Sequence, residues 1–139
     1  MDTTTKKEVF KKVYDFEQAV SDIHDLLDKK KVLPRRREAL TVAIEAVAEA
    51  MQFGYVGISE DGTITQTFIE PVENVDKLVY KPHVTAANMN KELNSIKIYT
   101  QTNVSLAYIS MYTDRPASQI NRLEPADRNI ADSIAFFFQ

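Results

Sequence analysis

The stretch YVGISEDGTITQTFIEPVENVDKLVYKP, residues 55–82, decides the fold class of this chain. It is rich in Thr, Ile, Val, Phe and Tyr, which favour strands, and its Asp61-Gly62 pair is a strong hairpin signal. Two strands alone are marginally stable, so we predict three antiparallel strands covered by helices. The predicted strands are residues 55–59, residues 63–69, which end at Pro71, and residues 77–81, which end at Pro82.

Side chains alternate between two faces along the predicted return strand, residues 63–69. One face carries Ile64, Gln66 and Phe68, and the other carries three threonines and Ile69. The adjacent carboxylates of Glu60 and Asp61 could suggest acid–base catalysis. Because they lie in a glycine-containing turn, we interpret them as turn residues instead.

The residues before this sheet predict an antiparallel helical hairpin over residues 6–53. Apolar residues recur at steps of four and three over residues 6–28, the pattern of a helix that packs lengthwise on another helix. A second helix is expected to begin near Pro34, continue this rhythm, and stop at Gly54. The first seam, most of which we interpret as intramolecular core, is Val9, Val13, Phe16, Val20, Ile23 and Leu27, and the second is Leu40, Ile44, Val47 and Met51.

Residues 85–139 predict a helical region made of short helices. Thr85 is expected to cap a helix that runs from Ala86 to about Ile98. Thr102 or Asn103 is expected to cap the next helix, which Asp114-Arg115-Pro116 ends. A short turn follows Pro116, and Pro125 opens the last helix with Asp127 in its first turn. The whole chain, residues 1–139, is thus predicted to be a single α+β domain.

Three consecutive phenylalanines stand near the end of the last predicted helix. Neighbouring residues on a helix lie about 100° apart, so three in a row cannot all face one core. Two interpretations stay open: an exposed aromatic patch that binds a partner, or an end that folds back and buries all three rings. The candidate partner-binding residues are Phe136, Phe137, Phe138, Ile134 and Tyr112.

Composition excludes several classes of protein. The chain has 139 residues, 44% of them hydrophobic and 27% charged, with a net charge of −3, as is ordinary for a soluble domain. It has no cysteine, which excludes disulfides, thiolate metal sites and cysteine nucleophiles. No apolar run is long enough to span a membrane, and the N-terminus lacks the apolar segment of a signal peptide. We therefore expect an intracellular protein without a membrane partner.

Two runs of basic residues suggest a possible nucleic-acid site. The alternative is that they are a solvated helix end and loop. Residues 1–37 carry ten basic and seven acidic residues, whereas the rest carries seven basic and thirteen acidic ones. Since a nucleic-acid footprint usually makes the whole domain basic, we disfavour nucleic acid and expect docking to protein. The possible basic patch is Lys29, Lys30, Lys31, Arg35, Arg36 and Arg37.

Motifs for catalysis and for cofactor or metal binding are missing from the sequence. Its three glycines, at 54, 57 and 62, form no phosphate-binding loop. Its two histidines, His24 and His83, have no ligand-like spacing, and we interpret both as surface or boundary residues. The prediction is a non-enzymatic binding or assembly protein with no catalytic residues, no cofactor and no metal.

The order of features from residue 63 onward resembles phage tail assembly chaperones, including the tail protein E-like group. A strand pair leads to LVYKPHVTAANM, residues 78–89, where a strand closes on proline and a threonine starts a helix. Residues 123–127, LEPAD, then place an aspartate four positions after a leucine, before an apolar last helix. The resemblance covers about half of the chain.

This resemblance implies a small non-enzymatic protein made in the cytoplasm of an infected bacterium. Such chaperones coat the long, helical tape measure protein and help to recruit tail tube subunits, and we also expect a homo-oligomer. Two alternatives stay open. One is a virion structural component of the tail, baseplate or head-tail junction, and the other is a nucleic-acid-binding regulator that uses the basic patch.

Overall fold

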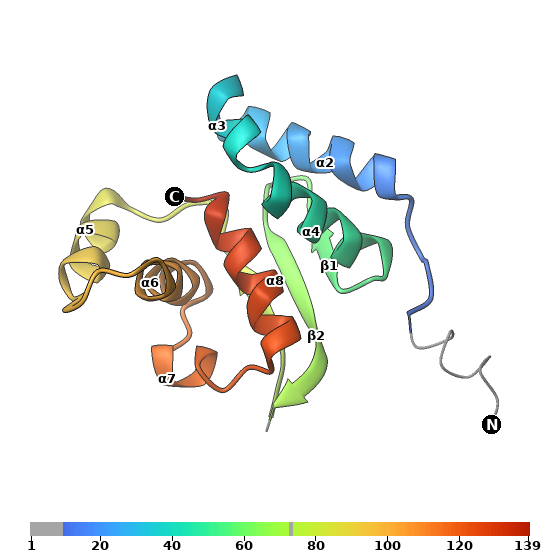
Figure 1. The fold of residues 1–139 in the computed structure, drawn as a ribbon. Coiled ribbons are helices and arrows are strands. Elements are labelled where there is room, and N and C mark those ends of the chain that lie inside the picture. The colour runs from blue at the N-terminus through green and yellow to red at the C-terminus, as the bar shows by residue number, and fades with distance from the viewer. Residues whose placement is uncertain (1–9, 73) are drawn as a thin grey trace.

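The computed structural model describes residues 10–72 and 74–139, and these form an α+β fold, as predicted (Figure 1). Along the chain, three helices precede a three-stranded antiparallel sheet and four follow it, within the described residues. The strands are β1 (Val56–Ile58), β2 (Ile64–Val72) and β3 (Val75–Tyr80). The helices in the described residues are α2 (Phe16–Lys29), α3 (Pro34–Ala39), α4 (Thr41–Gln52), α5 (Ala86–Asn94), α6 (Gln101–Thr113), α7 (Ala117–Ile120) and α8 (Pro125–Phe136).

The sheet has the order β1-β2-β3, and its hairpin turn lies where the Asp-Gly signal predicts it. The Oδ1 atom of Asp61 accepts the Thr63 N–H at 2.9 Å, and this hydrogen bond lowers the pKa of Asp61. The predicted alternation is confirmed, since Ile64, Gln66 and Phe68 are all buried. One face of β2 therefore points into the core.

The expectation that Pro71 ends the second strand is wrong. Strand β2 continues to Val72, and its register with β3 shifts between Thr67 and Val72. A proline is tolerated at such an irregularity because its missing N–H breaks no regular ladder bond. The third strand also begins earlier than predicted, at Val75, where it pairs with Val72.

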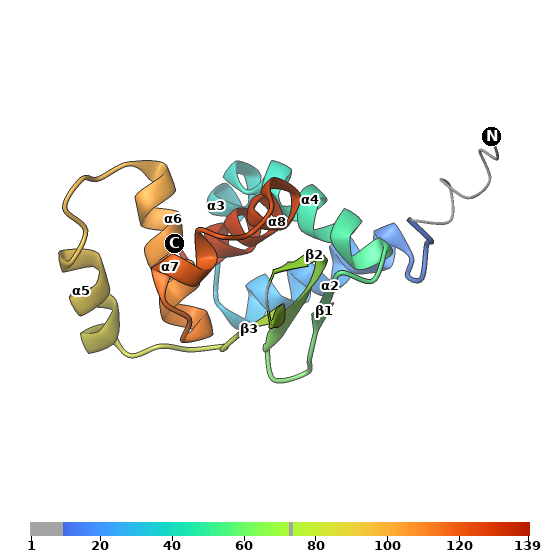
Figure 2. The same ribbon diagram turned by 90° about the horizontal axis from the view of Figure 1, so that it is seen from below.

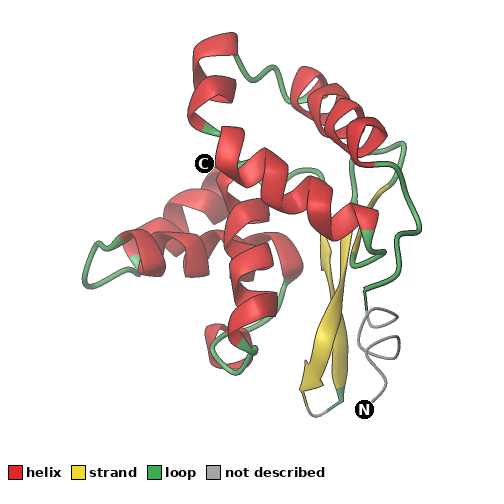
Figure 3. Ribbon diagram, turned by 45° about the vertical axis from the view of Figure 1, so that its right-hand side comes forward, coloured by secondary structure: helices red, strands yellow, loops and turns green. Residues whose placement is uncertain are grey.

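Helix α8 is the central element of the helical layer. It packs between α4 and α6 and also contacts β2, whereas α6 contacts β3 (Figure 1). Helix α5 lies on the far side of α6 (Figure 2). Most helices therefore lie to one side of the strands (Figure 3), and their shared core includes Ile23, Ile109 and Ile134, all without exposed surface.

The first helix is shorter than predicted, because residues 10–15 are not helical. Asp15 is the N-cap of α2, and its carboxylate accepts the Gln18 N–H at 2.9 Å. The N–H groups of Val13 and Tyr14 instead donate to the carbonyl of Gln52, at the end of α4. Val13 is 62% exposed, so its predicted place in the seam is wrong. Val9 lies outside the described residues.

The second predicted helix is interrupted at Leu40, where α3 ends and α4 begins. The Thr41 hydroxyl donates to the carbonyl of Glu38 at 2.8 Å, and such back-bonding bends helices. The side chain of Leu40 is buried at this break. The predicted stop at Gly54 is confirmed, since its φ of +83° is the left-handed conformation that favours glycine.

Local signals predict the later helices in part. Thr85 caps α5 and Pro125 opens α8, as predicted. The cap of α6 is Thr100, whose hydroxyl accepts the Asn103 N–H at 3.1 Å, so Thr102 and Asn103 were the wrong residues. Helix α5 ends at Asn94 and does not reach Ile98. Within the described residues, no helix combines the length and the apolarity that crossing a membrane requires.

Candidate protein-binding site

The three C-terminal phenylalanines are built into the fold. Phe137 is only 3% exposed, and Phe136 and Phe138 are half-buried. The ring of Phe138 stacks on Tyr112 with centroids 3.8 Å apart, and the Lys30 ammonium lies 4.5 Å from its centroid. The folded-back interpretation is therefore closer to the structure than an exposed patch. Partner binding through these rings stays a prediction that requires the end of α8 to detach.

The other two predicted partner-binding residues are also buried. Ile134 has no exposed surface and Tyr112 has 6%. Burial raises the pKa of the Tyr112 hydroxyl, as expected for a phenol moved away from water. Both residues belong to the core formed by α6 and α8, so neither offers a surface for docking in this conformation.

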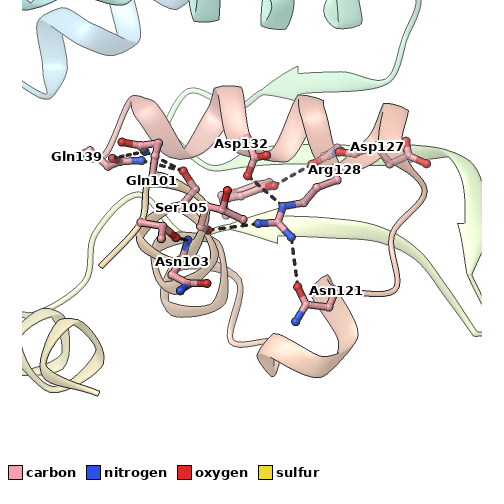
Figure 4. Close-up of polar contacts among 12 residues, drawn as sticks. Gln101, Asn103, Ser105, Asn121, Asp127, Arg128, Asp132 and Gln139 are labelled. Atoms are coloured by element: carbon pink, nitrogen blue, oxygen red, sulfur yellow. Dashed lines mark hydrogen bonds and ion pairs between the residues drawn. The ribbon is translucent and has the colours of Figure 1, made fainter. Parts of the chain in front are cut away.

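Polar contacts hold the end of α8 against two other helices, and those with α6 are drawn in Figure 4. The Arg36 guanidinium, in α3, donates to the carbonyls of Phe136 at 3.1 Å and Gln139 at 3.4 Å. The Gln139 side chain bridges to α6, where it accepts from Gln101 at 3.2 Å and donates to Ser105 at 3.4 Å. These contacts stabilise the buried position of the phenylalanines.

A second polar cluster joins α8 to α6 and α7. Arg128 forms an ion pair with Asp132 at 3.0 Å and donates to the side chain of Asn121 at 3.3 Å (Figure 4). It also donates to the carbonyl of Thr102 at 3.4 Å. The guanidinium is thus occupied by three elements of the fold, and the cluster is structural.

Sequence reasoning missed a buried polar network around Gln66. Its amide donates to the carbonyl of Asp127 at 2.9 Å and accepts the Tyr80 hydroxyl at 2.8 Å. The Asp127 carboxylate accepts the N–H groups of Ile69 and Glu70 at 2.8 and 3.0 Å. A glutamine on the apolar face of a predicted strand was the available signal, because a buried amide needs partners.

The predicted basic patch is largely used inside the fold. Lys29 donates to the carbonyl of Glu60 at 2.6 Å, and Lys30 donates to that of Pro82 at 2.9 Å. Burial lowers the pKa of Lys30. Arg37 donates to the carbonyl of Val32 at 2.8 Å, in addition to the contacts of Arg36 described above. Two further members of the patch are exposed: Lys31 in the turn after α2, and Arg35 in the first turn of α3.

The two histidines lie on different segments of the fold and, within the described residues, do not contact each other through any hydrogen bond. His24 is half-buried on α2, with its Nδ1 atom 3.5 Å from the Arg37 guanidinium, and His83 is exposed between β3 and α5. Across residues 10–72 and 74–139, no group of three or more metal-ligating side chains is placed to hold a metal ion.

An open groove of about 830 Å³ runs between α2 and the α3–α4 segment, and we call it the α2–α4 groove. It is about three times as large as the hollow of about 280 Å³ between α5 and α6. Its apolar lining comes from Phe16 and Val20 on α2, with Pro34 and Ile44 on the opposite wall. The sequence analysis places Phe16, Val20 and Ile44 in the apolar seams, but it predicts that these seams close against each other in a helix–helix contact.

The edges of the α2–α4 groove are acidic. Three carboxylates line it, Asp28, Glu38 and Glu45, against one guanidinium, that of Arg37. Arg37 pairs with Asp28 at 2.5 Å. The side chains of Glu38 and Glu45 are exposed and make no hydrogen bond or ion pair with another described residue. The groove therefore combines an apolar floor with unneutralised negative charge on one edge.

Comparison with known proteins returns no relative: no family model, no curated protein and no solved structure matches this chain.

Proposed function

We propose that this chain is a non-enzymatic phage tail assembly chaperone that binds the tape measure protein and tail tube subunits in the host bacterial cytoplasm. The observation that carries the proposal is the α2–α4 groove, an open apolar surface between two helices. Helices recognise one another by laying an apolar stripe into such a groove. A long helical protein such as a tape measure offers stripes of this kind along its whole length.

Two further features support the proposal. The resemblance in residues 78–89 and 123–127 is to proteins that work by binding, and Thr85 and Asp127 hold structural positions in those segments. Self-association is part of the proposal, and the exposed apolar side chains of Ile98 and Tyr99 between α5 and α6 offer a surface for it.

A tagged pull-down of the full chain from cells that naturally make it tests the proposal, with mass spectrometry at low and high salt. We expect recovery of one very long helical protein that persists at high salt, because apolar contacts are weakly screened. Recovery of virion components without that protein, together with the chain in mature particles, would favour a structural role. Recovery of nucleic acid that washes away with salt would overturn the proposal.

A matched pair of variants links the recovered partner to the groove. Val20→Ser changes the half-buried floor of the groove, whereas Val79→Ser makes the same change at an exposed position on β3. We expect Val20→Ser to lose most of the recovered partner and Val79→Ser to retain it. Thermal unfolding of both variants checks that each is folded at the temperature of the pull-down.

A further inference from the structure

The α2–α4 groove has a chemical preference that the proposed function does not specify. From the groove's charge and shape, we infer that its occupant is a basic amphipathic helix of a partner protein. This inference rests on the proposed function only for the biological source of the partner. The chemistry of the groove itself comes from its own residues.

The walls of the groove favour a helical occupant. Both walls are helices, and their backbone groups are hydrogen-bonded within each helix, so they offer no ladder to an extended peptide. A third helix satisfies its own backbone and presents only side chains. The α2 wall runs from Phe16 to Asp28, about 18 Å at 1.5 Å per residue, which matches about three turns of a partner helix.

The floor of the groove selects an apolar stripe. Phe16 and Val20 are half-buried, so a partner that covers them removes apolar surface from water, and the buried Ile44 lies beside them. Beyond the groove, Val42 stands 81% exposed on α4, between Glu38 and Glu45 in sequence. Val42 thus adds exposed apolar surface on the helix that also carries Ile44 and Glu45.

The edge of the groove selects positive charge. Glu38 on α3 and Glu45 on α4 both line the groove, and neither side chain is paired within the described residues. Lysine and arginine side chains can cover apolar surface with their stems and reach such carboxylates with their charged ends. An acidic partner helix would instead place like charges together, which is unfavourable.

Two synthetic 18-residue helical peptides with the same leucine stripe test this inference on the full chain. One has a polar face of lysine and the other a polar face of glutamate, and isothermal titration calorimetry measures each affinity. We expect a dissociation constant on the order of micromolar for the basic peptide and binding at least about tenfold weaker for the acidic one. Equal binding of both peptides, or no binding of the basic one, would overturn the inference.

Charge reversal locates the site. The double variant Glu38→Lys with Glu45→Lys should lower the affinity for the basic peptide by about 10- to 100-fold and raise the affinity for the acidic peptide. The control is Glu60→Lys with Asp76→Lys, which changes the net charge equally at exposed positions on the β1–β2 turn and on β3. It should keep the affinity within about twofold. If both double variants lower the affinity for the basic peptide equally, the peptide is attracted to the acidic chain in general, and the assignment of the binding site to the groove is wrong.

The peptide assay and the pull-down can fail independently. If the long helical protein is recovered equally well by the wild type and by the Glu38→Lys, Glu45→Lys double variant, the proposed function stands and this inference is wrong. If the groove prefers the basic peptide but no tail protein is recovered from cells, the inference stands and the proposed function is wrong.

Discussion

The carboxylate of Asp127, in the first turn of α8, accepts the backbone N–H of Ile69 in β2 at 2.8 Å, and it accepts the N–H of Glu70 at 3.0 Å. These two residues lie where β2 and β3 shift register, between Thr67 and Val72. The side chain thus joins the central helix to the irregular end of the sheet. Asp127 has no exposed surface, so its hydrogen bonds are shielded from water.

Asp127→Asn should lower the free energy of unfolding by about 2 kcal/mol, as measured by urea denaturation. The amide can accept one of the two N–H groups, but its NH₂ group then faces the other and leaves it unpaired. The control Asp132→Asn alters a partly exposed ion pair with Arg128 and should cost less than about 1 kcal/mol. Equal losses in the two variants would contradict the special role of Asp127.

Tyr80→Phe should lower the free energy of unfolding by about 1–2 kcal/mol at neutral pH. Within the described residues, the Tyr80 hydroxyl is the only one that donates to the buried side-chain oxygen of Gln66, and the variant removes it. It should also change the response to alkali. Burial raises the pKa of Tyr80 well above its ordinary value, so above pH ~10 the unfolded chain releases a proton that the folded chain keeps. Stability should therefore fall as the pH rises past that point.

Urea denaturation of wild type and Tyr80→Phe across pH 9–11.5 measures this effect as a difference in slope. One group contributes at most about 1.4 kcal/mol per pH unit. Lys30 has the opposite effect: because burial lowers its pKa, the folding stability rises with pH just below the ordinary pKa of lysine. Lys30 is present in both proteins, so its contribution cancels in the comparison. Parallel pH profiles for the two proteins would show that Tyr80 does not keep its proton.

Gly54→Ala should destabilise the chain by about 1–2 kcal/mol, measured by thermal unfolding. Its φ is +83°, and an added Cβ would lie 3.1 Å from the Cγ2 of Val13. Gly57→Ala is the matched control, because nothing lies within 4 Å of its Cβ position and its φ is not in the left-handed range. It should stay within about 0.5 kcal/mol of wild type. If Gly57→Ala destabilises the chain more than Gly54→Ala does, the left-handed backbone conformation at Gly54 is wrong.

Phe137→Ala should cost about 3–5 kcal/mol of unfolding free energy, the usual range for a buried aromatic residue. Ile98→Ala is the control, at a side chain that is 69% exposed, and it should cost less than about 1 kcal/mol. If Phe137→Ala leaves the stability unchanged but abolishes partner recovery, the ring is a partner anchor and its packing in the core is wrong.

Local sequence determined much of the fold. The Asp-Gly turn, the alternation of Ile64, Gln66 and Phe68, the stop at Gly54 and the start of α8 at Pro125 all follow from residues close together in the chain. Each depends on the conformational preference of one or two residues, or on the two-residue repeat of a strand. Such preferences act without the rest of the protein, which is why these predictions are confirmed.

Tertiary structure decided what depends on distant partners. The non-helical path of residues 10–15 accompanies the bonds from the N–H groups of Val13 and Tyr14 to the carbonyl of Gln52. The continuation of β2 through Pro71 accompanies the bonds from Ile69 and Glu70 to Asp127. The burial of the C-terminal phenylalanines accompanies the contacts of Arg36, one hundred residues before Phe136. No local pattern encodes these pairs.

The α2–α4 groove shows the same division. Sequence periodicity identified Phe16, Val20 and Ile44 as apolar seam residues, but it could not say which part of the seam stays open. That depends on where α8 packs, because α8 covers one side of α4 while α2 covers another. The sequence alone determined the elements and their apolar faces. The packing of helices far apart in the chain decided which of those faces is left for a partner, because only packing removes a face from water.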